Sequence, residues 1–174
     1  DLYSAVTAAI GTLKGPLHGG ANTAVMQMLM ELEEQGKDAD AVAFTKDKLA
    51  KKEKIMGFGH RVYKTFDPRA RHLQKMAQSL SEETGHEELY RWSMDMLNTM
   101  KSEKNIDPNV DFFSATVYFS MGIQPDLYTC IFTMSRIAGW AGHYMEQMEH
   151  NRLVRPRALY FGEKNMAYTP IERR

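Results

Sequence analysis

Apolar residues recur at intervals of three and four along most of this 174-residue sequence, and that spacing restricts the fold more than any other feature. Between residues 21 and 32 the apolar positions fall on one side of a helix, which Gly36 then stops. The segment 87–104 repeats the pattern, with apolar residues at Leu89, Trp92, Met96 and Met100. A strand would need alternation with a period of two, so these segments predict helices. We therefore expect an all-α fold.

Turn-forming residues delimit several further helices. We expect them over about 38–54, 68–84, 111–122 and 125–150, and the sequence also opens inside an apolar helical pattern. Asp38 or Asp40 can cap the first of these helices, and the helix over 111–122 is apolar enough to be buried. The tail, residues 157–170, carries two β-prone stretches around a polar turn. A short C-terminal β-hairpin is expected there.

The overall charge is balanced, with 22 Lys and Arg residues against 22 Asp and Glu residues. This balance gives no reason to expect a nucleic acid or a membrane as partner. The single cysteine, Cys130, cannot form an internal disulfide, and the first residues lack a signal-peptide pattern, so we expect a cytoplasmic protein. Because the sequence begins within a helical pattern and without methionine, we also expect it to be a piece of a longer polypeptide.

Basic residues are concentrated in one region despite this balance. Residues 46–75 contain ten basic residues and three acidic ones, and they surround the motif GFGHR. For the lysines of residues 46–54 a solvated helix face is the simpler interpretation. Arg61, Lys64 and Arg69 instead follow a glycine loop, whose exposed N–H groups together with basic side chains favour a phosphate or carboxylate ligand.

Histidine stands beside glycines twice, as His18 in GPLHGGAN and as His60 in GFGHR. Glycines leave a histidine without side-chain cover, and imidazole exchanges its proton near neutral pH. With Asp111 these residues suggest acid–base chemistry. Two rivals are weaker: the spacing of the histidines matches no metal-binding motif, and no serine or cysteine lies in a nucleophile motif.

Five motifs, in the order GPLHGGAN, GFGHRVYKTFDPRA, NVDFFSATVY, SRIAGWAGH and RPRA, make the sequence resemble the C-terminal half of citrate synthase. The match covers essentially the whole chain and is closest to the shorter bacterial type and to 2-methylcitrate synthase. The resemblance implies an all-α fold in which residues 20–118 form a small domain that binds CoA and carries the catalytic residues. Residues 1–19 and 119–174 would belong to the large domain, the latter with the C-terminal tail.

The resemblance also implies a reaction, the condensation of acetyl-CoA with oxaloacetate to citrate and CoA through an enol or enolate and citryl-CoA. Asp111 would remove the methyl proton, and His18 would hydrogen-bond the thioester oxygen. His60 would hydrogen-bond the ketone of oxaloacetate and donate to the new alkoxide. Since a thioester methyl is a very weak acid, the carboxylate can act only if donors stabilise the developing oxyanion at the same time.

The residues that bind the substrates are implied in the same way. Arginines matching Arg69, Arg136 and Arg155 would hold the carboxylates of oxaloacetate, the last from the second subunit of a homodimer, with Arg157 as a competitor for that role. The adenine-embracing segment and the phosphate contacts of CoA would comprise Ile55, Met56, Gly57, Phe58, Gly59, Arg61 and Lys64. Acetyl-CoA would be a cosubstrate, with no permanently bound cofactor and no metal.

Three alternatives remain open at the level of the sequence. The family's N-terminal half is absent, and the chain alone is expected to be inactive until that half is supplied. The acyl substrate could be propionyl-CoA, as in 2-methylcitrate synthase, because one methylene changes binding by only about 1–3 kcal/mol. The chain could also bind CoA-type ligands without turnover, although a degenerate binder has no reason to keep His18, His60 and Asp111 together.

Overall fold

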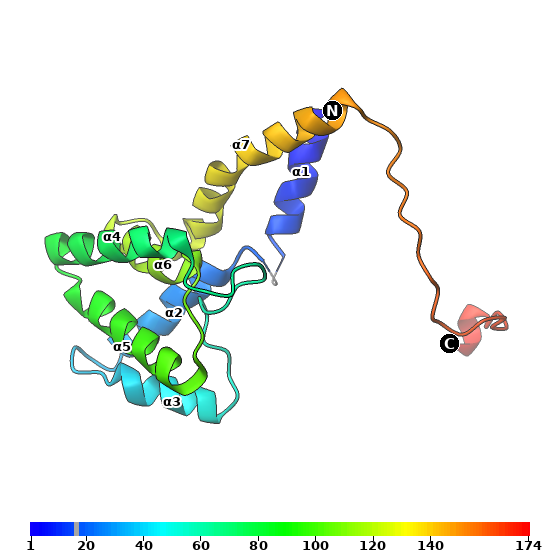
Figure 1. The fold of residues 1–174 in the computed structure, drawn as a ribbon. Helices are drawn as coiled ribbons and strands as arrows, with labels where there is room; N and C mark the ends of the chain where they lie inside the picture. The colour runs from blue at the N-terminus through cyan, green and yellow to red at the C-terminus, as the bar shows by residue number, and fades with distance from the viewer. Residues whose placement is uncertain (16–17) are drawn as a thin grey trace.

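The structure is a computed structural model that describes residues 1–15 and 18–174, and all regular elements in these residues are helical (Figure 1). The α-helices are α1 (Leu2–Leu13), α2 (Ala21–Glu33), α3 (Ala41–Ala50), α4 (Pro68–Thr84), α5 (Glu87–Lys104), α6 (Val110–Ser120) and α7 (Tyr128–Glu149). Two short 3₁₀ helices are η1 (Pro125–Leu127) and η2 (Ile171–Arg173). The predicted all-α class is confirmed.

Side-chain caps explain where four of the helices begin. At the start of α1, Asp1 accepts a hydrogen bond from the backbone N–H of Ser4 at 2.9 Å. Asp40 accepts a hydrogen bond from the backbone N–H of Ala43 at 2.9 Å, so the helix expected from Asp38 or Asp40 starts after the second of them. Asp67 caps α4 with Pro68 in its first turn, and Asn109 caps α6. The sequence predicts that the helix capped by Asp40 ends near Lys54, but α3 ends at Ala50. The earlier end is explained by Lys52, which adopts a left-handed φ of 60°.

Helix α6 lies at the centre of the core. Its residues from Phe112 to Val117 are buried, which confirms the expected buried helix, and it packs against α2 and α4. Trp92 and Met96 of α5 add their side chains to the same hydrophobic cluster. Burial of α6 on several sides fixes its N-terminus, and with it the position of Asp111, relative to the surrounding helices.

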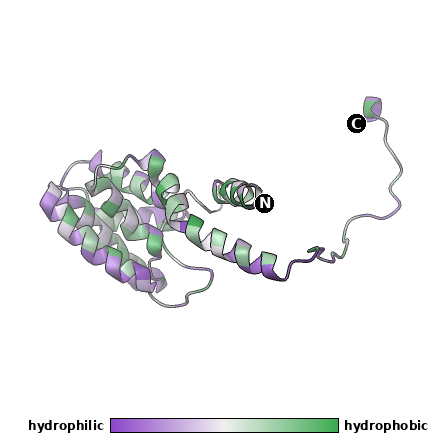
Figure 2. Cartoon of the chain, turned by 90° about the horizontal axis from the view of Figure 1, so that it is seen from above, coloured by the Kyte–Doolittle hydropathy of each residue, from purple (hydrophilic) through white to green (hydrophobic). Residues whose placement is uncertain are grey.

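Helices α1 and α7 pack against each other and extend from this helical body (Figure 1). Large apolar side chains remain exposed on both, including Tyr3 on α1 and Met134 on α7. Figure 2 shows hydrophobic residues along α1, which lies outside the body. Among the described residues, no helix combines the length and the apolar character that crossing a membrane requires.

The C-terminal tail differs from the expectation. The hairpin expected over residues 157–170 is not present: that segment forms no strand and runs away from the helical body (Figure 1). Its β-prone side chains Leu159, Tyr160 and Phe161 are all exposed. A two-stranded hairpin without a surface to cover is marginally stable in water, which accounts for the difference.

Candidate active site

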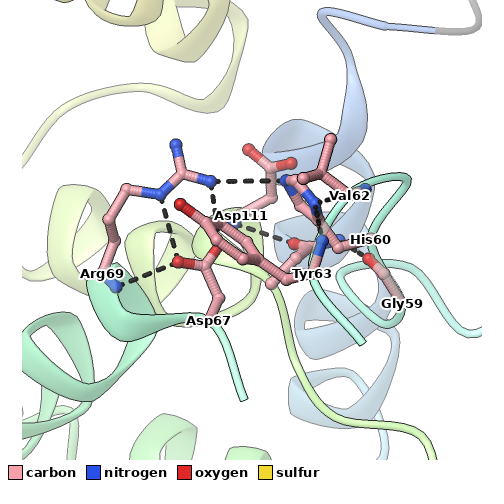
Figure 3. Close-up of polar contacts among 8 residues, drawn as sticks. Gly59, His60, Val62, Tyr63, Asp67, Arg69 and Asp111 are labelled. Atoms are coloured by element: carbon pink, nitrogen blue, oxygen red, sulfur yellow. Dashed lines mark hydrogen bonds and ion pairs between the residues drawn. The ribbon is translucent and has the colours of Figure 1, made fainter. Parts of the chain in front are cut away.

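A cavity of about 200 Å³ opens where the N-terminus of α6 meets the loop before α2, the loop before α4, and α7. The residues lining it are His18, Gly19, His60, Arg69, Asn109, Val110, Asp111, Phe132 and Arg136. Five of the residues singled out in the sequence therefore face one space, although they are spread over more than a hundred positions. Figure 3 shows three of them, Arg69, His60 and Asp111, close together.

Asp111 lies in the first turn of α6, where Asn109 accepts a hydrogen bond from its backbone N–H at 2.9 Å. Burial of the side chain raises the pKa of Asp111, because a desolvated carboxyl favours the neutral form. The nearby charges of Arg69 and His18 act in the opposite direction without cancelling this effect. A carboxylate with a raised pKa is a stronger base, which suits proton abstraction.

The imidazole of His60 is held with a defined orientation. Its Nδ1 accepts hydrogen bonds from the backbone N–H groups of Val62 and Tyr63, each at 3.0 Å. Because Nδ1 is an acceptor in both bonds, the hydrogen of the neutral ring must be on Nε2. The Nη2 atom of Arg69 lies 3.5 Å from this Nε2 (Figure 3). Both groups are then donors, and their positions suit an acceptor oxygen that receives hydrogen bonds from both.

Asp67 fixes the guanidinium of Arg69. The Nε and Nη2 atoms of Arg69 donate to the two carboxylate oxygens at 3.1 and 2.8 Å (Figure 3). Asp67 is only 1% exposed, and although burial opposes ionisation, the side-chain and backbone hydrogen bonds from Arg69 lower the pKa of Asp67 overall. The carboxylate stays charged and orients the arginine, whose side chain is 45% exposed and lines the cavity.

His18 and Arg136 line the cavity and both contact Phe132. The Phe132 ring contacts the His18 ring edge-on, with centroids 6.0 Å apart, and the Arg136 guanidinium lies 4.7 Å from its centroid. Thr129, one turn earlier on α7, donates to the carbonyl of Gly19 at 2.7 Å. These contacts connect the loop that carries His18 to α7, the helix that carries Arg136.

The glycine loop before His60 is docked onto α6. Gly57 has a φ of 82°, and a Cβ atom there would lie 2.9 Å from the Cα of Phe112. Gly57 is thus required both by its conformation and by the close approach of two backbones. Phe58 packs its ring against Phe112 with centroids 4.5 Å apart, so the loop and the start of α6 form a single packed unit.

The residues expected to bind CoA lie beside two further cavities. One, of about 370 Å³, is lined by residues 54–58 together with Lys104 and others. The second, of about 280 Å³, is lined by Gly59, His60 and Lys64 and by residues 105–108. Arg61 is exposed and lines neither. Most of the segment expected to bind CoA therefore lines one or the other of two cavities.

Of the arginines expected to bind oxaloacetate, Arg155 and its competitor Arg157 do not line the cavity of about 200 Å³. Both lie in the exposed, irregular tail, which extends away from the helical body. Among residues 1–15 and 18–174, no group of three His, Cys, Asp or Glu side chains is arranged to hold a metal ion.

Three residues at this site were not recognised from the sequence as contributors. Asp67 orients Arg69, Phe132 contacts both His18 and Arg136, and Asn109 bonds to both α6 and the glycine loop. Asp67 and Asn109 do carry a sequence signal, since both stand at the N-cap position that the helix-start rules favour. Phe132 carries none, because an apolar residue on a helix normally indicates core.

A family model for the C-terminal domain of citrate synthase matches residues 1–157. The chain belongs to the citrate synthase family. It is 53% identical to citrate synthase 2 of Bacillus subtilis, over all of this chain and 46% of that protein, and 43% identical to the 2-methylcitrate synthase of Shewanella oneidensis, again over all of this chain and 46% of that protein. It thus spans just under half the length of these relatives.

Among solved structures of the citrate synthase family, the enzyme from Thermoplasma acidophilum superimposes with a TM-score of 0.84 at 39% identity. The match covers all of this chain and 47% of that one. That structure is a ternary complex of the enzyme with carboxymethyl coenzyme A and oxaloacetate. The family resemblance inferred from the five motifs is therefore confirmed.

Proposed function

We propose that this chain, joined to the remaining part of a citrate synthase, condenses acetyl-CoA with oxaloacetate to give citrate and CoA. The observation that carries the proposal is the cavity at the start of α6, where one carboxylate, two imidazoles and two arginines face the same space. Acid–base chemistry on a substrate with several carboxylates needs this combination of groups. The names of the relatives support the same reaction.

In the first step Asp111 removes a proton from the methyl group of acetyl-CoA. The raised pKa of Asp111 supports this role, because the carboxylate holds the transferred proton more firmly than an exposed one would. His18 donates a hydrogen bond to the thioester oxygen as negative charge develops there. Removing the proton and stabilising the oxyanion are coupled, and neither group alone would lower the barrier by much.

In the second step the nucleophilic carbon of the enol or enolate attacks the ketone carbon of oxaloacetate, and a carbon–carbon bond forms. The ketone oxygen becomes an alkoxide and takes the hydrogen from Nε2 of His60. The hydrogen bonds that Nδ1 accepts from Val62 and Tyr63 support this step, since they keep the hydrogen on Nε2. Water then hydrolyses the thioester of citryl-CoA and releases citrate and CoA.

The carboxylates of oxaloacetate are assigned to Arg69 and Arg136, both of which line the cavity. We assign a further contact to Arg155 of a second copy in a homodimer. The exposed tail that carries Arg155 supports this assignment, because it extends away from its own helical body and could reach another. The proposed domains are residues 20–118 as the small domain, with residues 1–19 and 119–174 in the large one.

Acetyl-CoA is proposed to lie along the glycine loop. Residues 55–59 would surround the adenine, with Arg61 and Lys64 near the phosphates. Support comes from the two cavities on either side of this loop and from Lys54 and Lys104, which line the larger one. The basic character of residues 46–75 favours the same ligand. We further propose a cytoplasmic enzyme of the tricarboxylic acid cycle, as the relatives named citrate synthase suggest.

The test uses a chimera in which this chain replaces the matching segment of Bacillus subtilis citrate synthase 2. We expect the chimera to release free thiol from acetyl-CoA when oxaloacetate is present, and the isolated chain to release none. Asp111→Ala should lower release by about 10²–10⁴-fold while oxaloacetate still binds, and Asp38→Ala, an exposed position in the α2–α3 loop, is the matched control. A folded chimera that releases no thiol, or an Asp111→Ala variant that releases thiol at close to the unsubstituted rate, would contradict the proposal.

A second candidate is 2-methylcitrate synthase, which condenses propionyl-CoA with oxaloacetate. The observation in its favour is the 43% identity to the enzyme of that name from Shewanella oneidensis. The two activities are distinguished by comparing kcat/KM of the chimera for acetyl-CoA and for propionyl-CoA. We expect acetyl-CoA to be preferred, and a preference for propionyl-CoA would establish the second candidate instead.

A further inference from the structure

Asn109 lines two of the cavities described above. It borders the cavity of about 200 Å³ that contains Asp111 and the two histidines, and it also borders the cavity of about 370 Å³ beside residues 54–58. The side chain is half-buried between them. A ligand that extends from one cavity to the other must therefore pass close to Asn109.

The backbone on both sides of Asn109 is paired with the glycine loop. Phe58 and Pro108 form an antiparallel bridge, the smallest unit of a β-ladder. On either side of it the N–H of Asn109 donates to the carbonyl of Gly57, and the N–H of Gly59 donates to the carbonyl of Asp107, both at 2.9 Å. The loop and the segment before α6 are thereby held in a fixed register.

The side-chain amide of Asn109 uses both of its ends. Its Oδ1 accepts from the backbone N–H of Asp111 at 2.9 Å, and its Nδ2 donates to the carbonyl of Gly59 at 2.8 Å. Only an amide can do both, since a serine hydroxyl is too short to span the two partners and a carboxylate cannot donate. The choice of asparagine rather than another N-cap residue is thus explained by the second bond.

We infer that Asn109 is a positioning residue that transmits the state of the glycine loop to the carboxylate of Asp111. The inference rests on the proposed function, in which the loop binds CoA and Asp111 is the base. When a ligand fixes residues 57–59, the carbonyl of Gly59 holds the amide of Asn109, and the amide holds the first turn of α6. Binding at one cavity thereby orders the base in the other.

The kinetic test replaces Asn109 by serine in the chimera, because serine still caps α6 but cannot reach Gly59. We expect kcat to fall about 3- to 10-fold, the effect of one neutral hydrogen bond, and KM for acetyl-CoA to rise. KM for oxaloacetate should stay within about twofold, since Arg69 and Arg136 keep their contacts. Asp40→Ser is the matched control, because Asp40 caps α3 without bonding to the loop. It should leave all three parameters unchanged.

Hydrogen exchange of the chimera, with coenzyme A alone as the probe, tests the coupling without turnover. In the unsubstituted protein CoA should slow exchange both in residues 57–63 and in residues 110–116. In Asn109→Ser it should still slow exchange in the loop but no longer in α6. Equal protection of both segments in the variant, or kinetics that match the unsubstituted enzyme, would overturn the inference.

If CoA protects neither segment of the unsubstituted chimera, the proposed function fails. Hydrogen exchange without ligand then tests whether Asn109 links the glycine loop to α6. Faster exchange in residues 57–63 of Asn109→Ser than of the unsubstituted protein would support the link between the loop and α6. Identical exchange in the two proteins would refute it.

Discussion

Replacing Gly57 by alanine gives a prediction whose size can be worked out from the structure. The φ of 82° lies in the left-handed region, which costs an L-residue roughly 1–2 kcal/mol. The added Cβ would also lie 2.8 Å from Cγ2 of Val25 and 2.9 Å from the Cα of Phe112. Val25 is fully buried and the α6 backbone at Phe112 is packed in the core, so the neighbours on both sides have to shift. Overpacking of this kind costs about 1–3 kcal/mol.

We therefore expect Gly57→Ala to lower the free energy of unfolding by about 2–5 kcal/mol, measured by urea denaturation followed by circular dichroism. Gly59→Ala is the matched control, two residues away in the same loop. Its φ is 78°, but a Cβ there would meet only Cγ2 of Ile106 at 3.8 Å. It should lose only the roughly 1–2 kcal/mol of the conformational penalty. Equal losses in the two variants would refute the argument that α6 and the loop touch backbone to backbone.

Two further predictions concern the groups around the cavity. Since the pKa of Asp111 is raised, its carboxyl binds a proton more tightly in the folded chain than in the unfolded one. The free energy of unfolding therefore falls as pH rises from the ordinary pKa of an aspartate to the raised pKa of Asp111. Asp111→Asn should accordingly raise Tm at pH 7 and bring a smaller gain at acidic pH; a lower Tm at pH 7 would contradict the burial argument. Thr129→Val removes the donor to Gly19 and should cost about 1 kcal/mol and reduce thiol release by the chimera, whereas Thr133→Val, which loses a bond within α7, should keep the activity.

The sequence predicts the helices well because most of them combine a clear apolar period with a visible start or stop. Asp67 followed by Pro68 locates the beginning of α4, and the apolar residues of α6 indicate its burial. The end of α3 could not be predicted, since nothing local requires Lys52 to adopt a left-handed conformation. The prediction of a C-terminal hairpin was wrong because β-propensity alone does not supply the surface that a pair of strands has to cover.

For the candidate site too, part of the structure could be predicted from the sequence and part could not. Glycines beside His18 and His60 identify loops that present an imidazole, and the family motifs select Asp111 and the arginines. How the site is held together could not be read from the sequence, because it depends on contacts between distant segments. The bond from Asn109 to Gly59 spans fifty positions, and the bond from Thr129 to Gly19 spans more than a hundred. Such pairs become visible only when the helices are packed.

A double-mutant cycle on His18 and Asp111 tests the central claim most directly, namely that an imidazole and a carboxylate act together on one acyl-CoA. Thiol release by the chimera is measured for His18→Ala, Asp111→Ala and the double variant. If the two groups act in one step, each single change should lower kcat by about 10²–10⁴-fold, and the double variant should lie within about tenfold of the worse single one. Losses that multiply in the double variant would show that the two groups act independently, and would contradict the account.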